Sequence, residues 1–202
     1  MNIINDMLRV PLVLASASPR RADTLRSLGF SIIISPSLLD ETVYDHLPVN
    51  DRVMALAELK ARDGSAKTPM PPLLALGGDT LVTLDNHVLG KPSNAEEATA
   101  MLRLLSGKTH LVVSGLCLLD RQTGSATTAF SETKVSFSSL TNEEIEWYVS
   151  TGEWKGAAGA YRIQEGAALF IDSIEGSFSG VVGLPLHLFY AMISAIARPI
   201  PE

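Results

Sequence analysis

Short hydrophobic runs alternate along the chain with segments of helical periodicity. The run Leu12–Leu14 has no helical spacing, so it predicts a buried strand. A helix is expected to start at Pro19, because proline is favoured at the first helical position. The apolar run 30–35 then predicts a second strand, and the hydrophobic spacing in 51–63 predicts a second helix.

The middle of the chain predicts strands of a different kind. Residues 73–76 form an apolar strand that is expected to end at the two glycines before Asp79. Residues 81–84 and 87–89 are separated by two turn residues, which predicts a short antiparallel hairpin.

Two long strands, 111–119 and 126–137, are expected to pair with each other around a tight turn. Such a hairpin cannot arise from parallel crossovers, so we predict an α/β fold with a long mixed sheet of six or seven strands flanked by helices. The other predicted elements are two helices that begin at capping-box patterns, a late strand and a last helix: Ser93–Glu96, Thr141–Glu144, 168–174 and 185–197.

The length and composition suit one substantial core. The chain has 202 residues, of which 46% are hydrophobic and 19% are charged. Two separate domains would each be small, so we expect a single domain over 1–202, with two lobes. Residues 1–10 are expected to form a loosely held N-terminal extension.

The charge balance excludes some partners. A formal net charge of -6 argues against general nucleic-acid binding and against a membrane-surface protein, so a polyanionic ligand would need a local basic pocket. The single cysteine, Cys117, lies in an apolar run and is expected to be a small buried hydrophobe. The first residues lack the pattern of a secretory signal, and the uncharged segment 185–197 is too short to span a bilayer. A cytoplasmic location is therefore expected.

The segment 12–21 combines a strand, a hydroxyl-rich turn and a helix start. Ser18 is placed to cap the helix, and the helix N-terminus would point its amides at the turn that holds Ser16 and Ser18. Arg20 and Arg21 add guanidinium groups suited to phosphate oxygens or to a base edge. The turn therefore predicts phosphate binding, and the alternative is an ordinary strand–turn–helix with two surface arginines.

Three carboxylates are candidates for acid or metal chemistry. Asp79 follows two glycines that allow a ligand or metal to approach the backbone, although it could instead cap its own turn. Asp40 and Glu41 lie on a loop far away in sequence, where they are either solvated or ligands. Carboxylates from separate segments, together with substrate phosphates, are what a Mg²⁺ site uses.

Two lysines extend the set of possible phosphate ligands. Lys60 lies at the border of the apolar face of the predicted helix, from which it could reach into a cleft or extend to solvent. Lys91 directly follows the short hairpin. The four histidines have no metal-ligand spacing and are expected to be structural, and no Walker-type loop, nucleophile elbow or His-Glu-x-x-His pair is present.

Eight short matches occur in order over nearly the whole chain: Ser16-Ala-Ser-Pro-Arg-Arg21, Glu41, Leu59-Lys-Ala61, Gly78-Asp-Thr80, Leu89-Gly-Lys-Pro92, Leu102-Arg-Leu-Leu-Ser-Gly107, Ala158-Gly-Ala-Tyr161 and Val182-Gly-Leu-Pro185. Together they resemble the Maf family of nucleoside triphosphate pyrophosphatases. The resemblance implies a fold shared with the inosine triphosphatases, with a cleft between two lobes. It also implies hydrolysis between the α and β phosphates of a nucleoside triphosphate, a Mg²⁺ or Mn²⁺ cofactor, and a homodimer.

The resemblance also implies roles for individual residues. Asp79 matches the catalytic acid of the family, and Glu41 matches a carboxylate that helps to hold metal. The positions implied for phosphate contact are Ser16, Ser18, Arg21, Lys60 and Lys91.

The base-discriminating positions resemble the branch of the family that prefers dTTP and UTP. These positions hold Arg20, Thr80 and Gln164, and the amide of Gln164 offers both a donor and an acceptor to a uracil or thymine edge. The chain departs from the usual pattern at Ala157, where a lysine is common, and at Arg162, where a glycine is usual. The alternatives are a pyrophosphatase for 7-methyl-GTP or another non-standard nucleotide, and a regulator that senses nucleotides without hydrolysing them.

Overall fold

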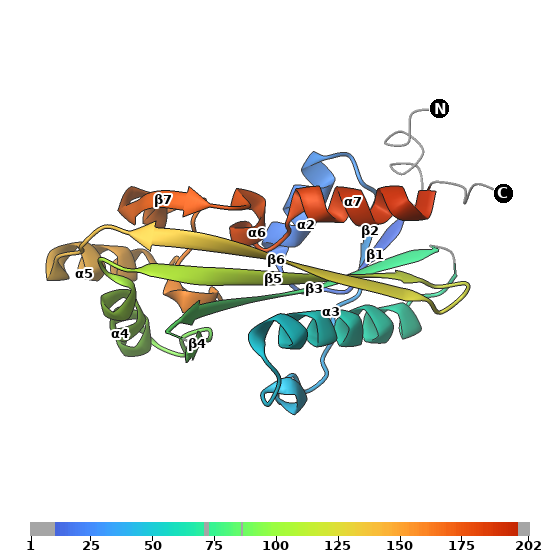
Figure 1. Cartoon of the computed structure of the whole chain (residues 1–202), viewed down its shortest axis with the longest axis horizontal. Helices are drawn as coiled ribbons and strands as arrows, with labels where there is room; N and C mark the ends of the chain where they lie inside the picture. The colour runs from blue at the N-terminus through green and yellow to red at the C-terminus, as the bar shows by residue number, and fades with distance from the viewer. Residues whose placement is uncertain (1–10, 71–72, 86, 198–202) are drawn as a thin grey trace. The chain divides into compact units, whose positions relative to one another are not determined.

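The computed structural model describes residues 11–70, 73–85 and 87–197, and the extension predicted at 1–10 lies outside them. It contains a seven-stranded mixed sheet with helices on its faces, which confirms the predicted α/β fold (Figure 1). The sheet order is β2-β1-β3-β5-β6-β7, with β4 added beside β3. The strands are β1 (Leu12–Leu14), β2 (Ile32–Ile34), β3 (Leu74–Leu84), β4 (His87–Leu89), β5 (Thr109–Asp120), β6 (Ala126–Phe137) and β7 (Ile171–Glu175).

The helices match most of the predicted positions. They are α2 (Pro19–Ser27), α3 (Val49–Ala66), α4 (Ala95–Leu105), α5 (Asn142–Thr151), α6 (Phe178–Val182) and α7 (Leu186–Ala197), with 3₁₀ turns η1 (Thr42–Tyr44), η2 (Ala158–Ala160) and η3 (Gly166–Phe170). None of the helices in the described residues is long and apolar enough to cross a membrane.

The chain divides into two compact units. The first consists of Met1–Asp79, Ser114–Ser131 and Gly183–Glu202, and the second of Thr80–Val113 and Glu132–Val182. A single domain with a cleft between two lobes stays a prediction.

The first unit buries both faces of its strand β1. β1 pairs in parallel with β2 and with β3, and all three of its residues are buried. Leu12 and Leu14 pack in a cluster with residues of α2 and α7, whereas Val13 packs with Ala57 of α3. This alternation explains the continuous apolar run, because a strand covered by helices on both faces needs hydrophobic residues at every position.

The predicted end of the third strand is wrong. β3 does not stop at the glycines but continues through Asp79 to Leu84. A Cβ on Gly77 would meet the carbonyl oxygen of Ala57 and would lie 2.7 Å from the nitrogen of Ala61. The glycine therefore allows close packing of β3 on α3, and it does not mark a turn.

The second unit contains the C-terminal parts of β3 and β6 and the N-terminal part of β5. β4 pairs antiparallel with β3 at Thr83 and Val88, which confirms the predicted hairpin. The capping box at Thr141 and Glu144 is present with both of its hydrogen bonds. The other helix start is shifted by one residue, because Asn94, and not Ser93, accepts the hydrogen bond that caps α4.

The late strand also starts later than predicted. Residues 166–170 form the 3₁₀ turn η3, and β7 begins only at Ile171. Ala167 and Phe170 of the turn are buried in the hydrophobic core of this unit. The apolar residues before Ile171 therefore reflect core packing of a tight turn, which a short apolar run does not distinguish from a strand.

Candidate active site

The turn between β1 and α2 is held together by the hydroxyl of Ser16. This oxygen accepts hydrogen bonds from the backbone N–H of Ser18, at 3.2 Å, and from Nη1 of Arg21, at 3.0 Å. Nε of Arg21 donates to the carbonyl oxygen of Gly183 at 2.7 Å. Arg21 thus ties the turn to the Gly183-Leu-Pro185 segment that precedes α7.

Ser18 differs from its predicted role in one respect. It is the N-cap residue of α2 and Pro19 follows at the first helical position, as expected, but the hydroxyl of Ser18 makes no capping hydrogen bond. Its backbone N–H donates to Ser16. Ser18 therefore contributes its backbone to the turn, and its predicted contact with phosphate stays a prediction.

Asp79, Lys60 and Glu41 form one cluster of charges. Nζ of Lys60 lies 2.7 Å from Oδ1 of Asp79 and 2.9 Å from Oε1 of Glu41. Asp79 lies in the interior of β3, Lys60 lies on α3, and Glu41 immediately precedes η1. Three elements that are distant in sequence therefore bring two carboxylates onto one ammonium group.

Burial makes this cluster a strong interaction. Only 11% of the side chains of Lys60 and of Asp79 is exposed, whereas 46% of the side chain of Glu41 is exposed. A lysine is rarely buried unless it is paired, so the structure excludes the alternative in which Lys60 extends to solvent. Oδ2 of Asp79 is buried and has no hydrogen-bond partner among the residues that the structure describes.

Arg21 lies in the same electrostatic environment. Burial lowers the pKa of its guanidinium, the attraction of Asp79 raises it, the neighbouring charge of Arg20 lowers it, and Glu41 raises it. Arginine titrates far above neutral pH, so Arg21 stays a cation in this position. A Cβ on Gly78 would lie 3.4 Å from Nε of Arg21, so the glycine leaves room for the arginine beside β3.

The donor set of the cluster fits a divalent cation. A Mg²⁺ ion is usually held by one or two carboxylates and completes its coordination with water and substrate phosphates. Asp79 and Glu41 supply two carboxylates, and the unpartnered Oδ2 of Asp79 is an available ligand atom. No group of three or more His, Cys, Asp or Glu side chains placed to hold a metal ion occurs in the described part of the chain.

Asp40 belongs to its own turn. Its Oδ1 accepts hydrogen bonds from the backbone N–H of Thr42, at 2.9 Å, and from the Thr42 hydroxyl, at 2.8 Å. The backbone hydrogen bond is the main reason why the pKa of Asp40 is lowered. The pairing with Lys60 therefore singles out Glu41, and not Asp40, as the loop carboxylate of the cluster.

Arg20 lies on α2 in the first unit, and the other remaining predicted residues lie in the second unit. Thr80 follows Asp79 in β3, Lys91 is exposed after β4, and Gln164 is exposed in the loop before η3. A site shared by Thr80, Lys91 and Gln164 with the residues of the first unit stays a prediction.

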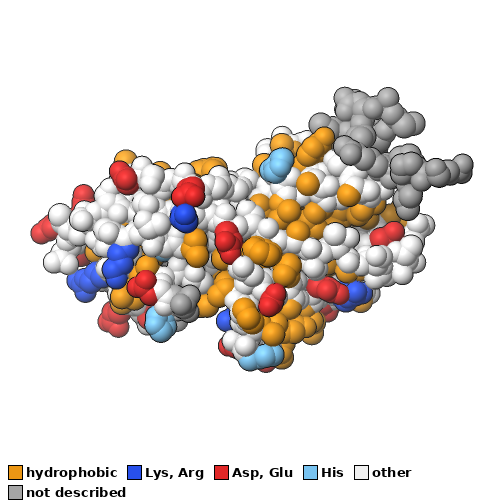
Figure 2. Space-filling model, in the orientation of Figure 1, with side chains coloured by type: hydrophobic (Ala, Val, Ile, Leu, Met, Phe, Trp, Pro, Cys, Tyr) orange, Lys and Arg blue, Asp and Glu red, His pale blue; other side chains and the backbone are white. Residues whose placement is uncertain are grey.

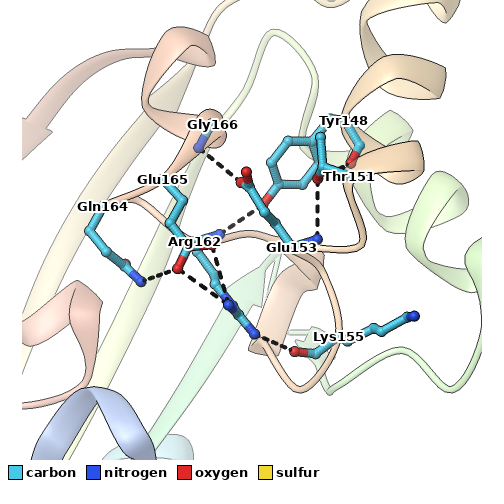
Figure 3. A network of polar contacts seen from close by, with 8 residues as sticks. All are labelled: Tyr148, Thr151, Glu153, Lys155, Arg162, Gln164, Glu165 and Gly166. Carbon is cyan, nitrogen blue, oxygen red and sulfur yellow. Dashed lines mark hydrogen bonds and ion pairs between the residues drawn. The ribbon is translucent and has the colours of Figure 1, made fainter. Parts of the chain in front are cut away.

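The chain departs from the family pattern at Ala157 and Arg162, and the structure shows what surrounds each residue. The guanidinium of Arg162 contacts Glu165 and the carbonyl oxygen of Lys155 (Figure 3). The ammonium of Lys155 lies 5.7 Å from the centre of the Trp154 ring, and Ala157 is buried. Lys155 therefore stabilises its own loop through Trp154, and the positive charge of Arg162 is paired with the negative charge of Glu165.

Sequence reasoning missed three contributions to these sites. The carbonyl oxygen of Gly183 receives Arg21, the hydroxyl of Tyr148 accepts from the backbone of Arg162, and Glu165 contacts both Arg162 and Gln164. The motif Val182-Gly-Leu-Pro185 marks this segment in the sequence, but nothing in its composition indicates a carbonyl acceptor.

Comparison with known proteins defines the class of the chain. Residues 11–196 match the model of the Maf-like protein family, so the chain belongs to this family.

Individual relatives of known name are similar to the chain over most of its length. A dTTP/UTP pyrophosphatase from Moorella thermoacetica is 48% identical over 87% of this chain and 89% of that protein. A dTTP/UTP pyrophosphatase from Pyrococcus abyssi is 40% identical over 95% of this chain and 99% of that protein. A solved dITP/XTP pyrophosphatase from Mycobacterium abscessus is more distant, with 17% identity and a TM-score of 0.42 over 63% of this chain and 74% of that one.

Proposed function

We propose that this protein is a nucleoside triphosphate pyrophosphatase that acts on dTTP and UTP. It hydrolyses the bond between the α and β phosphates and releases a nucleoside monophosphate and pyrophosphate. The observation that carries the proposal is the buried Lys60 between Asp79 and Glu41. Its support is membership of the Maf-like family and the names of relatives that are 40% and 48% identical.

The basic residues bind and orient the triphosphate. Acidic and basic side chains are interspersed on the face in view in Figure 2. Because such a mixed surface does not attract an anion by itself, a triphosphate needs a local group of cations. Arg21 is held by Ser16 and Gly183 in one orientation, which reduces the entropy lost on binding an anion. Arg21 and Lys60 then neutralise phosphate charge, with Lys91 and the turn of Ser16 and Ser18 as further proposed contacts.

Asp79 acts at the reacting centre. Water attacks the α-phosphorus, the bond from that phosphorus to the bridging oxygen breaks, and the electron pair leaves with pyrophosphate. The buried Oδ2 of Asp79 has one of two roles, to accept the proton that water loses or to hold the metal that makes the bound water more acidic, while Lys60 holds Oδ1 in place. The fixed positive charges stabilise the negative charge that develops on the leaving pyrophosphate.

A divalent cation is part of the proposal. Asp79 and Glu41 would hold Mg²⁺ or Mn²⁺, which stabilises negative charge on phosphate oxygens and makes a bound water more acidic. Arg20, Thr80 and Gln164 are the proposed base-selecting residues. The proposal also includes a cytoplasmic homodimer, and sedimentation equilibrium of the purified protein tests the dimer.

A pyrophosphate assay over a panel of nucleotides tests the function. The panel contains dTTP, UTP, CTP, GTP and 7-methyl-GTP, each with Mg²⁺ or Mn²⁺ and each repeated with EDTA. We expect monophosphate and pyrophosphate from dTTP and UTP, with the highest kcat/KM in the panel, and loss of turnover in EDTA. Release of inorganic phosphate and a diphosphate, preference for 7-methyl-GTP, or binding without product would each contradict the proposal.

A further inference from the structure

The loop that carries Gln164 places a carboxylate between two donors (Figure 3). Nε2 of Gln164 donates to Oε1 of Glu165 at 3.3 Å. From the other side, Nη1 of Arg162 lies 3.3 Å from Oε1 and 3.2 Å from Oε2 of the same carboxylate. Nη2 of Arg162 donates to the carbonyl oxygen of Lys155 at 2.8 Å, so the guanidinium is itself fixed.

The backbone of the loop is anchored at both ends. The N–H of Arg162 donates to the hydroxyl of Tyr148 at 3.1 Å, and the N–H of Gly166 donates to Oε2 of Glu153 at 2.8 Å. Tyr148 is completely buried, which makes it a rigid support. Tyr148 and Glu153 therefore fix the backbone of the loop. The carboxylate of Glu165 contacts the side chains of Arg162 and Gln164.

The chemistry of Glu165 selects one arrangement of the Gln164 amide. A glutamine amide has two arrangements that exchange its oxygen and its NH₂ group. An ionised carboxylate accepts hydrogen bonds and donates none. Glu165 therefore stabilises the arrangement with NH₂ toward it, and it repels the arrangement with the amide oxygen toward it. Gln164 is left with its carbonyl oxygen and one N–H for a ligand.

We propose that Glu165 is a positioning residue for base selection, an inference that rests on the proposed function. The N3–H of uracil or thymine is a donor, and it matches the carbonyl oxygen that Gln164 presents. N3 of cytosine is an acceptor, and it would face that oxygen without a proton between them. Fixing the amide thus converts a group that could pair with either base into one that favours UTP and dTTP over CTP.

The test compares kcat/KM for UTP and CTP in the parent protein and in Glu165→Ala. The variant lets the amide turn over, so we expect the UTP-to-CTP ratio to fall about tenfold, the effect of one lost hydrogen bond to a charged group. The change should lie in KM for the two nucleotides, with kcat for UTP close to that of the parent protein. Glu165→Gln offers a donor as well as an acceptor to Gln164, so it should give a ratio between those of Glu165→Ala and the parent protein.

Glu175→Ala is the matched control, because Glu175 is an exposed carboxylate in an ion pair with Lys134 at 3.1 Å. It should leave the ratio unchanged. A ratio in Glu165→Ala equal to that of the parent protein, or an equal fall in kcat for both nucleotides, overturns the positioning role while the pyrophosphatase activity stands. Absence of pyrophosphate release by the parent protein overturns the proposed function, and the positioning role with it.

Discussion

Lys60 and Asp79 account for each other's burial. Removing either charge from water alone costs several kcal/mol, and a partner at hydrogen-bond distance is needed to offset that cost. Nζ of Lys60 lies 2.7 Å from Oδ1 of Asp79, and the carboxylate of Glu41 lies 2.9 Å from the same nitrogen. The helical spacing places Lys60 at the border of an apolar face, but its direction depends on carboxylates from β3 and from the loop before η1. Local sequence does not contain that information.

His110 is a second buried titratable residue, and it predicts acid sensitivity. Its Nε2 lies 2.8 Å from the hydroxyl of Tyr161, and burial lowers the pKa of His110 from 6.5 to about 4. Between these values the unfolded chain binds a proton that the folded chain does not, so unfolding becomes easier as the pH falls. We expect His110 to remove about 3 kcal/mol of stability between pH 7 and pH 4.

Urea denaturation at several pH values measures this effect. In His110→Gln the residue no longer titrates and retains a polar group for Tyr161, so the free energy of unfolding should fall less steeply over the same pH range. His187→Gln is the control, because His187 is exposed. If the parent protein and His110→Gln show the same pH dependence, the buried neutral histidine is not its cause.

At the scale of elements, the contact of β3 with α3 positions Asp79 beside Lys60. Gly77 lies against the backbone of Ala57 and Ala61, where even a methyl group meets backbone atoms. Gly77→Ala should therefore lower the free energy of unfolding by about 3 kcal/mol, at the upper end for overpacking. Chemical denaturation with Gly90→Ala as control measures this, because nothing lies within 4 Å of a Cβ on Gly90. Equal stability of the two variants would contradict close packing at Gly77.

Elements were predictable wherever one periodicity dominates. The helical spacing in 51–63 corresponds to α3, and the long strand at 126–137 has the predicted bounds of β6. The errors fall where another interaction decides. β3 runs through its glycines because α3 packs on them, and residues 166–170 turn because Ala167 and Phe170 are buried in a core that forms far from them in sequence.

At the scale of the whole molecule, most of the candidate site residues were predicted from the resemblance to the family. Short motifs identified Asp79, Lys60 and Glu41, and the structure brings these three residues together in the first unit. The base-discriminating positions of the family pointed to Gln164 but not to Glu165, since the role of Glu165 depends on a loop held by Tyr148 and Glu153. Contacts that complete a site from outside its motifs become visible only in the folded chain.

The central claim is that Asp79 lies at the reacting centre of a pyrophosphatase. The most direct measurement is pyrophosphate release from UTP and dTTP by Asp79→Asn. Asp63→Asn is the control, because Asp63 lies in α3 and pairs with Lys67, which follows the helix, at 2.6 Å. An asparagine still accepts from Lys60 and Glu41 still pairs with it, so the variant should keep its fold, with a melting temperature lowered by the loss of the buried Asp79 charge. The account predicts a loss of turnover of about a thousandfold or more in Asp79→Asn alone, and near-normal pyrophosphate release by that variant would contradict it.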